Sequence, residues 1–322
     1  MMRYKLYLIL ILIVSLSSNM SAQYFNGNNT FWKNQKHSFG FGIGAANFLG
    51  ELGGRDQIGS RFIYDMEWSQ TKPALQANYR YQFGQRLFAK TQFAFALVGG
   101  NDALTEEIFR RNRNLHFRST IYELTVQMEV DLVQFISSSR YNIASASKKN
   151  SSIYVSLGLG ATRFNPKANF QGEWYELRKF GTEGQKQEGG PEEYSLITLV
   201  IPMGLGFRYE INKEWTIGAE LVHRVTFTDY MDDVSTVYFD NDIIKQTQGE
   251  LAAHFADPSL GYYVDGNREI PLNSTFTGAQ RGQPDENDAY FTFTVNAYYK
   301  IQKGFTKGKG RVIKRRHRRA VF

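Results

Sequence analysis

The sequence predicts an all-β protein: an eight-stranded antiparallel transmembrane β-barrel with long outer loops and a basic C-terminal tail. Three observations support this prediction. Segments of alternating polarity recur along the chain, the face opposite the apolar one is polar and charged, and the connections alternate between long and short. The composition agrees, because 15% of the 322 residues are aromatic and aromatic residues favour strands.

The alternation is clearest in the stretch 196–209, where Ile197, Leu199 and Ile201 share one face and Thr198 lies on the other. Apolar residues at every second position indicate a half-buried strand. Eight segments follow this pattern, and each is near the ~9–11 residues needed to cross a bilayer as a tilted strand. They are 38–49, 74–83, 87–98, 122–132, 152–164, 196–209, 215–224 and 290–299.

The second face of these segments is glycine-rich and carries charges of both signs. A soluble β-sandwich also alternates, but it would direct these charges into bulk water. In an eight-stranded barrel they point inward, where side chains just fill the space. We therefore predict an interior ion network of Arg80, Lys90, Glu123, Glu129, Arg208, Glu220 and Arg224, with room left by Gly158, Gly160, Gly204 and Gly206.

The connections form the third observation. Long gaps at 50–73, 99–117, 165–194 and 226–289 alternate with short links at 84–86 and 210–214; the long, Ser-rich link 133–150 is an exception. Outer-membrane barrels have short periplasmic turns and long outer loops, so the pattern places both termini in the periplasm. Aromatic residues at the periplasmic strand ends predict a girdle of Tyr79, Tyr81, Phe83, Phe207, Tyr209, Trp215, Tyr298 and Tyr299.

The N-terminus has the layout of a signal peptide, with Arg3 and Lys5 before an apolar run and small residues up to Ala22. The run is too short for a membrane-spanning helix. The chain has no cysteine, which excludes disulfides and a lipid-modified N-terminal cysteine. We predict a signal peptide over residues 1–22, an N-terminal periplasmic segment over 23–36, the barrel over 37–301 and a basic tail over 302–322.

The tail holds the excess charge of a chain whose formal net charge is +7, while the rest is mildly acidic. A basic run suits nucleic acid, anionic lipid or an acidic protein surface. The exported location argues against nucleic acid, and a solvated disordered tail is the alternative. The predicted partner-binding residues are Lys303, Lys307, Lys309, Arg311, Lys314, Arg315, Arg316, Arg318 and Arg319.

Motifs for catalysis are missing from the sequence, which has no HExxH, no GxSxG and no Walker-type loop. One candidate hydrolase site is the pair His37 and Ser38, but this pair begins the first strand and has no evident acid beside it. A second candidate site is His223 with the acidic run 229–233, but such a run is more often a solvated loop anchor. We therefore predict no enzymatic activity and no cofactor.

The last long loop also offers oxygen ligands for a cation, in Asp240, Asp242, Asp285, Glu286 and Asp288. Hard cations such as Ca²⁺ prefer oxygen ligands. The glycine-punctuated spacing of a calcium loop is missing. The sequence therefore favours an ordinary polar outer loop and no metal.

Four stretches stand out together: 47–51 (Asn-Phe-Leu-Gly-Glu), 113–119 running into 121–124, 228–235 (Thr-Asp-Tyr-Met-Asp-Asp-Val-Ser), and 279–282 with 288–291. Together they resemble the PorG-like outer-membrane family of Bacteroidota, associated with type IX secretion and gliding. The stretch 228–235 is the most specific. The motif residues are Asn47, Gly50, Glu51, Arg113, Asn114, Phe117, Arg118, Asp229, Tyr230, Asp232, Asp233, Arg281 and Gly282.

The resemblance implies a non-enzymatic outer-membrane role, in contact with a periplasmic ring made of a PorK-like lipoprotein and a PorN-like protein. The role of the basic tail is inferred from its charge and position, and not from the resemblance. The alternative is an adhesin or ligand-binding barrel that acts through its surface loops. A channel is not expected, since side chains occupy the lumen of an eight-stranded barrel.

Overall fold

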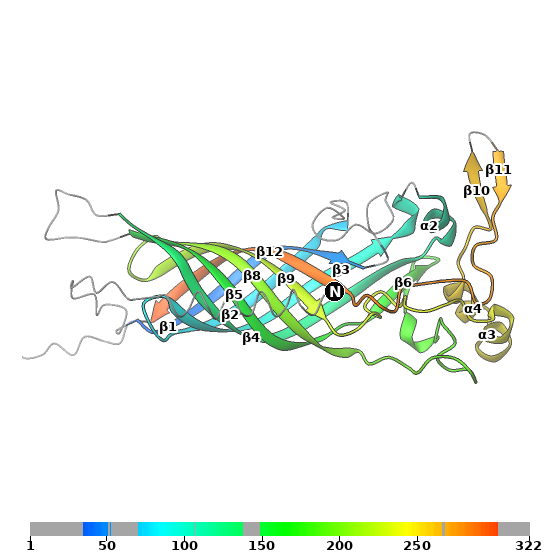
Figure 1. Cartoon of the computed structure of the whole chain (residues 1–322), viewed down its shortest axis with the longest axis horizontal. Coiled ribbons are helices and arrows are strands. Elements are labelled where there is room, and N and C mark those ends of the chain that lie inside the picture. Colours follow the sequence, from blue (N-terminus) through cyan, green and yellow to red (C-terminus); the bar gives the residue numbers. More distant parts are fainter. Residues whose placement is uncertain are drawn as a thin grey trace, which may run out of the picture.

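The computed structural model describes residues 35–50, 52, 70–105, 107–137, 149–265 and 268–301. Within these residues, eight antiparallel strands close into a barrel, and a cap covers one of its ends (Figure 1). The strand order is β3-β2-β1-β12-β9-β8-β5-β4, and β3 pairs with β4 to close the sheet. This confirms the predicted fold class.

The barrel strands are long enough to cross a bilayer. They are β1 (His37–Leu49), β2 (Lys72–Gln82), β3 (Leu87–Asn101), β4 (His116–Ser137), β5 (Lys149–Arg163), β8 (Ile197–Glu210), β9 (Trp215–Thr226) and β12 (Ala289–Ile301).

The register places both ends of the barrel sequence at one end of the molecule. His37 at the start of β1 pairs with Ile301 at the end of β12 and with Tyr81 near the end of β2. The short connections 83–86 and 211–214 close this same end. We call it the turn end, and the opposite end the cap end (Figure 1).

Strand β4 is longer than its alternation predicts. Its register shifts between Asp131 and Val133, so that Leu132 and Val133 are both exposed. Alternation breaks at such a bulge, and the predicted strand therefore stopped too early. The bounds predicted for the long link, 133–150, were too wide at both ends: β4 runs to Ser137 and β5 begins at Lys149, so the link comprises residues 138–148, which lie outside the described residues.

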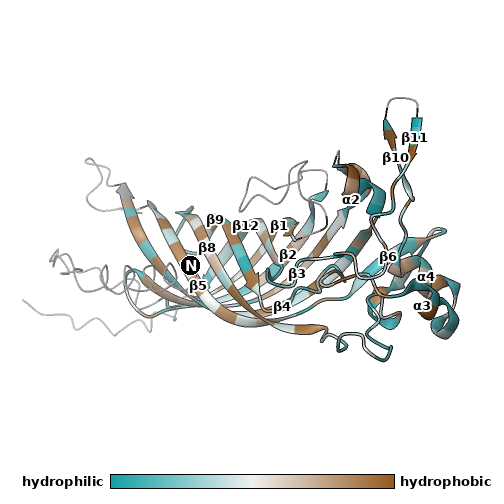
Figure 2. Ribbon diagram, turned by 45° about the vertical axis from the view of Figure 1, so that its right-hand side comes forward, coloured by the Kyte–Doolittle hydropathy of each residue, from teal (hydrophilic) through white to brown (hydrophobic). Residues whose placement is uncertain are grey.

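Along each barrel strand, apolar residues that point outward alternate with polar residues that point into the barrel (Figure 2). A polar interior and an apolar exterior are the pattern of a transmembrane β-barrel of the outer-membrane type. Within the described ranges, no helix is long and apolar enough to span a membrane. Exposed outward residues include Phe39, Phe41, Ile43, Phe93, Leu124, Val126, Leu159, Leu199, Leu205, Phe293 and Val295.

The cap is built from the long connections that follow β3, β5 and β9, whose described residues form helices and hairpins. Strands β6 and β7 form a hairpin that extends the sheet from β4, and β10 and β11 form a separate hairpin that projects from the cap (Figure 1). The cap elements are η4 (Asp102–Leu104), α2 (Ile108–Arg113), β6 (Pro166–Phe170), β7 (Glu173–Glu176), η5 (Leu177–Lys179), α3 (Asn241–Gln248), α4 (Glu250–Ala256), β10 (Tyr262–Asp265) and β11 (Arg268–Pro271).

An apolar core joins the cap to the barrel. Towards the cap end, the inward-facing positions change from charged to apolar, and they pack against buried cap residues. Fully burying a Val, Leu, Ile, Phe or Met side chain stabilises by about 1.5–3 kcal/mol, so this core holds the cap in place. We call it the apolar plug; it includes Ala46, Phe48, Val98, Phe117 and Ile121 of the barrel and Leu177, Met231, Val234 and Phe255 of the cap.

Candidate functional site

The barrel interior contains all seven residues of the predicted ion network, and each is buried. Lys90 lies at the centre, with its Nζ 2.5 Å from Oε1 of Glu220 and 3.3 Å from Oε1 of Glu129. Glu129 is also within 2.7 Å of Arg208 and 3.5 Å of Arg80. Charges in such surroundings are costly unless they are paired, and here each acid meets at least one cation.

A second ion pair lies nearer the cap end, where Arg224 Nε is 2.7 Å from Oε2 of Glu123. Arg224 also donates to Thr292 Oγ1 at 2.7 Å, and the Tyr290 hydroxyl donates to Glu123. Sequence reasoning missed Asp131, which is buried and pairs with Arg208. Its place two residues after Glu129 was the signal, because both fall on the inward face.

Aromatic rings fill the space beside the interior arginines. The Arg208 guanidinium lies 3.9 Å from the ring centroid of Tyr154, in a cation–π contact. A Cβ on Gly206 would come within 2.3 Å of the same ring. The predicted role of this glycine as a source of room is therefore visible in the packing.

One girdle residue was assigned to the wrong face. Tyr298 is fully buried inside the barrel, with the Arg80 guanidinium 4.1 Å from its ring centroid, whereas its neighbour Tyr299 is exposed on the outside. Strand alternation forces adjacent residues to opposite faces, so Tyr298 and Tyr299 could not both belong to an outer girdle. The inward ring fits above Gly40, where a Cβ would be 2.3 Å from it.

A second buried polar cluster lies in the cap, and we call it the cap hub: Thr182, Glu183, Tyr194, Asp233 and Arg281. Arg281 Nη1 is 2.9 Å from Glu183 Oε1 and donates to the Asp233 carbonyl oxygen at 2.6 Å. The Asp233 carboxylate accepts from Thr182 Oγ1 at 2.5 Å and from the Tyr194 hydroxyl at 2.6 Å. One guanidinium therefore serves two buried carboxylates.

The pKa values of the cap hub reflect the fact that one buried guanidinium serves two buried carboxylates. Burial raises the pKa of Asp233 from 3.8 to about 6, against the opposing effect of Arg281. Burial, with the nearby charge of Glu183, also raises the pKa of Tyr230 to about 12. Tyr230 stacks on Tyr194 with ring centroids 4.6 Å apart, so the hub is closed on one side by aromatic rings.

Arg113 of α2 forms an ion pair with Asp102 of η4 and a hydrogen bond to the cap hub. Arg113 Nε lies 2.7 Å from Oδ2 of Asp102, and Arg113 Nη1 donates to the Arg281 carbonyl oxygen at 2.8 Å. Burial lowers the pKa of Arg113, but the charge of Asp102 outweighs it and the net shift is upward. The connection 102–115 is thereby fixed to the connection 227–288.

The acidic run 229–233 is buried, and the expectation of a solvated loop anchor was wrong. Asp232 Oδ2 accepts from the Leu52 amide at 3.3 Å, and Asp232 Oδ1 accepts from the Val234 amide at 3.1 Å. Asp288 is also buried and accepts from the Met231 amide at 2.8 Å. Carboxylates can be buried when backbone amides solvate them, and amide partners cannot be recognised from sequence.

The residues behind the family resemblance gather around the cap and the plug. Asn114 ends α2 in the left-handed region (φ 56°) and donates to the Pro258 carbonyl oxygen. Arg118 instead faces outward, stacked 4.1 Å from the Trp174 ring. Glu51 lies outside the described residues. Tyr230 packs against the plug, and a Cβ added at Gly50 or Gly282 would clash with neighbouring atoms. The buried residues of the set are Asn47, Phe117, Asp229, Asp232, Asp233 and Arg281.

Sequence reasoning missed Asp102, Thr182 and Glu183 as members of this site. The sequence does contain two closely spaced glycines, Gly181 and Gly184, around Thr182 and Glu183. In the structure both glycines have positive φ (54° and 81°). Glycines so closely spaced indicate a tight turn, and such a turn presents Thr182 and Glu183 to the interior of the cap.

The candidate catalytic residues His37, Ser38 and His223 do not come together in the structure. His37 Nδ1 is 2.7 Å from the Tyr79 hydroxyl, and Ser38 is buried in the barrel at the turn end. His223 pairs in register with Phe291 towards the cap end. Among the described residues, no group of three His, Asp or Glu side chains is placed to hold a metal ion. The basic tail residues from Lys303 onward lie outside the described residues.

Comparison with solved structures finds small outer-membrane barrels. Ail of Yersinia pestis, solved with the heparin analogue sucrose octasulfate, is 9% identical, covers 83% of this chain and 99% of its own, and has a TM-score of 0.32. Neisserial surface protein A is 6% identical, with coverages of 82% and 96% and a TM-score of 0.33. OprG from Pseudomonas aeruginosa is 11% identical, with coverages of 84% and 98% and a TM-score of 0.30.

A search of curated proteins gives no match. A family model, in contrast, matches residues 19–253, which include seven of the eight barrel strands and much of the cap. The chain therefore belongs to the family described as Domain of unknown function (DUF6089).

Proposed function

We propose that this protein is a non-enzymatic outer-membrane anchor of the type IX secretion machinery that contacts its periplasmic ring. The observation behind the proposal is a lumen filled by buried ion pairs and closed at the cap end by the apolar plug. Such a barrel is suited to holding a position in the membrane rather than to passing solutes. The secretion role itself rests on the resemblance to PorG-like proteins of Bacteroidota.

The proposed orientation puts the cap outside the cell and the turn end in the periplasm. Its support is the position of His37 and Ile301 at the end with the short connections 83–86 and 211–214. Short turns face the periplasm in outer-membrane barrels. The residues that precede and follow the barrel would then begin on the periplasmic side.

In this orientation the basic tail is the proposed handle for the ring. Strand β12 ends at Ile301 at the turn end, and the nine Lys and Arg residues of the tail follow directly. A cationic segment favours a partner with an acidic surface and speeds its association. The proposed partners are the PorK-like lipoprotein and the PorN-like protein of the ring.

The test is a pull-down from intact cells after crosslinking, with three forms of the full chain: native, lacking residues 303–322, and with the nine tail Lys and Arg residues replaced by Gln. Heat-modifiability on gels verifies that each barrel is folded. We expect the native form to capture both ring proteins and the other two to lose them. Capture of surface proteins alone, or full capture without the tail, would contradict the proposal.

A second candidate function is ligand binding through the cap, which exposed apolar side chains favour. Phe109 and Val264 are 60% and 58% exposed, and the β10–β11 hairpin projects from the cap (Figure 1). The helix α2 and the strand β10, which carry these two side chains, are in contact, and a contiguous exposed apolar patch can mark a contact surface. The Leu272 amide donates to the Gly261 carbonyl oxygen at 2.9 Å, so residues 262–271 can be replaced by a short linker. Loss of surface attachment with secretion retained would favour this second function.

A further inference from the structure

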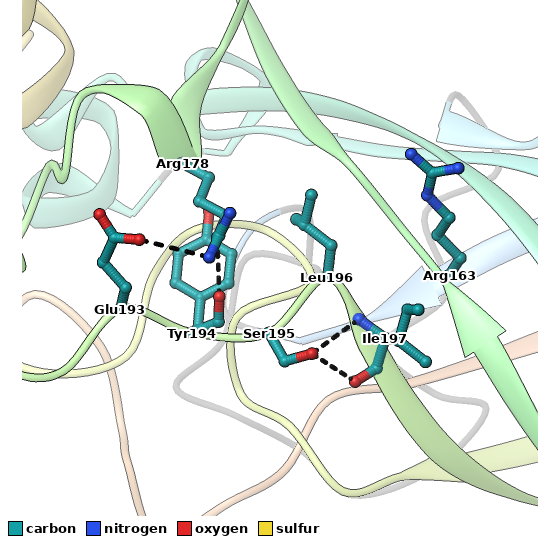
Figure 3. A pocket seen from close by; sticks show the side chains of 7 residues that line it. All are labelled: Arg163, Arg178, Glu193, Tyr194, Ser195, Leu196 and Ile197. Atoms are coloured by element: carbon teal, nitrogen blue, oxygen red, sulfur yellow. Dashed lines mark hydrogen bonds and ion pairs between the residues drawn. The ribbon is translucent and has the colours of Figure 1, made fainter.

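A hollow on the outside of the barrel lies where strands β5 and β8 meet the cap. It has a volume of about 520 Å³ and is lined by Arg163, Arg178, Glu193, Tyr194, Ser195, Leu196 and Ile197 (Figure 3). Arg163 is the last residue of β5 and pairs in register with Ile197, the first residue of β8. The hollow therefore lies at the upper edge of the membrane-facing surface.

The surface directly below the hollow is strongly apolar. Leu159 and Leu199 are 69% and 65% exposed, the highest values among the large apolar side chains that the structure describes. Both are on the outward face of the β5–β8 pair, and between Leu159 and Arg163 the outward position is the small Ala161. A hydrocarbon chain can pack along the exposed side chains of Leu159, Ala161 and Leu199.

Two arginines line this hollow, and both can interact with a bound anion. Arg163 is exposed and forms no ion pair with another described residue. Arg178 lies beside Tyr194 on the other side of Leu196 (Figure 3), with Nε donating to the Tyr194 carbonyl oxygen at 2.8 Å and Nη2 3.3 Å from Glu193. The Arg178–Glu193 pair is partly exposed, and such pairs are weak, so Arg178 can be shared with an incoming anion.

A smaller hollow of about 150 Å³ adjoins the first, and its lining adds two further cationic side chains. It shares Arg178, Glu193 and Leu196 with the first hollow and adds Lys179 and Lys186. The Lys186 ammonium donates to the Lys179 carbonyl oxygen, while Lys179 is 2.8 Å from Glu176. Together the two hollows present four cations and two carboxylates above an apolar surface.

We propose that these adjoining hollows bind a phosphorylated glycolipid of the outer leaflet, with one phosphate group on Arg163, another on Arg178 on the other side of Leu196 (Figure 3), and an acyl chain along Ala161 and Leu199. Guanidinium groups match phosphate oxygens in bidentate geometry, and basic pockets beside membrane strands or helices recognise anionic headgroups. The leaflet rests on the orientation proposed above. The choice of a phosphate group rests on the two arginines of the hollow, and the choice of an acyl chain rests on the apolar surface below it.

The test uses the full chain in nanodiscs of phosphatidylcholine doped with diphosphoryl lipid A, and native mass spectrometry counts the lipids that remain bound. Parallel nanodiscs contain dephosphorylated lipid A or phosphatidylglycerol. The variants are Arg163→Gln, Arg178→Gln and, as matched control, Arg86→Gln, which removes an exposed arginine in the turn between β2 and β3 at the opposite end.

We expect diphosphoryl lipid A to be retained by the native chain and by Arg86→Gln. Each hollow variant should bind it about fivefold more weakly, the effect of one interfacial cation. Equal loss in Arg86→Gln, equal retention of dephosphorylated lipid A or of phosphatidylglycerol, or displacement by inorganic phosphate would each overturn the proposal. The tail-dependent pull-down is independent of these variants, so failure here and failure of the secretion role are distinguishable.

Discussion

Glu183 and Arg281 lie 98 residues apart in the chain, yet they form a buried ion pair with 2.9 Å between Oε1 and Nη1. Glu183 also accepts from the backbone amides of Ser235 and Thr236. This single contact therefore joins the connection between β5 and β8 to the connection between β9 and β12. The cap is held together by such contacts as well as by its apolar plug.

Replacing Arg281 by Gln should open the cap without unfolding the barrel. The change leaves the buried carboxylates of Glu183 and Asp233 without their shared cation, and breaking a buried pair costs about 3–5 kcal/mol. We expect rapid proteolysis within the cap, while heat-modifiability on gels shows an intact barrel.

The matched control for this prediction is Arg268→Gln, which removes an exposed arginine in the β10–β11 hairpin of the same cap. It should leave the rate of proteolysis unchanged. Equal protection of the Arg281→Gln cap and the native cap would show that the plug alone holds the cap together.

The stability of the cap should fall as the pH rises through about 6. The pKa of Asp233 is about 6 in the folded cap, above its ordinary value of 3.8, so the folded cap binds this proton more tightly than the unfolded chain does. The resulting stabilisation is complete below pH 3.8 and is lost as the pH passes 6. Its upper limit is about 3 kcal/mol.

The measurement is the urea midpoint of cap opening, followed by pulse proteolysis from pH 4.5 upward. This pH interval excludes the titration of Glu176. Hydrogen bonds from Lys179 and Asn165 lower the pKa of Glu176 to about 2, so its contribution to stability is lost only as the pH falls below 4.5. Asp233→Asn should flatten the profile and the exposed Asp265→Asn should not. An unchanged profile in Asp233→Asn would assign the pH dependence to other groups.

The barrel interior was largely predictable from sequence because strand geometry imposes a period of two. Once Lys90, Glu129 and Arg208 are assigned to the inward face, a closed barrel places all three side chains in the same lumen. The strand register then decides which of them meet. The errors occur where this period is broken or ignored. The bulge after Asp131 hid the end of β4, and adjacent Tyr298 and Tyr299 were assigned to one face.

The cap could not be predicted in the same way, because its contacts follow no local period. Nothing near Glu183 in the sequence points to Arg281, and Asp232 is satisfied by backbone amides rather than by a residue type that a motif would show. The stretches that resemble the PorG-like proteins include Asp233 and Arg281. That resemblance gives no indication that the two residues are buried together.

Replacing Lys90 by Met should destabilise the whole barrel. Lys90 lies between Glu129 and Glu220, and its loss leaves Glu220 without its cation at a buried position, at a cost of about 3–5 kcal/mol. The temperature of the heat-induced gel shift should fall. The double variant Lys90→Met with Glu220→Gln should recover part of the loss, because Glu129 keeps Arg208 and Arg80. A single variant as stable as the native chain would show that the lumen admits compensating water.

Gly206 gives the sharpest test of interior packing, because a single methyl group is added. In Gly206→Ala the new Cβ would lie 2.3 Å from Cζ of Tyr154, whose ring is held against Arg208. Overpacking of this kind costs about 1–3 kcal/mol, so the gel-shift temperature should fall. Gly84→Ala is the matched control, since the nearest atom to its Cβ is 4.0 Å away in the β2–β3 turn.

A double-mutant cycle then tests whether the ring of Tyr154 is the obstacle. Tyr154→Leu removes the ring, and the methyl group of Gly206→Ala should cost much less in that background than in the native one. The coupling between two residues in contact is typically 0.5–3 kcal/mol, roughly the size expected here. If the two changes instead add independently, the strain of Gly206→Ala lies in the β8 backbone and not in the contact with Tyr154.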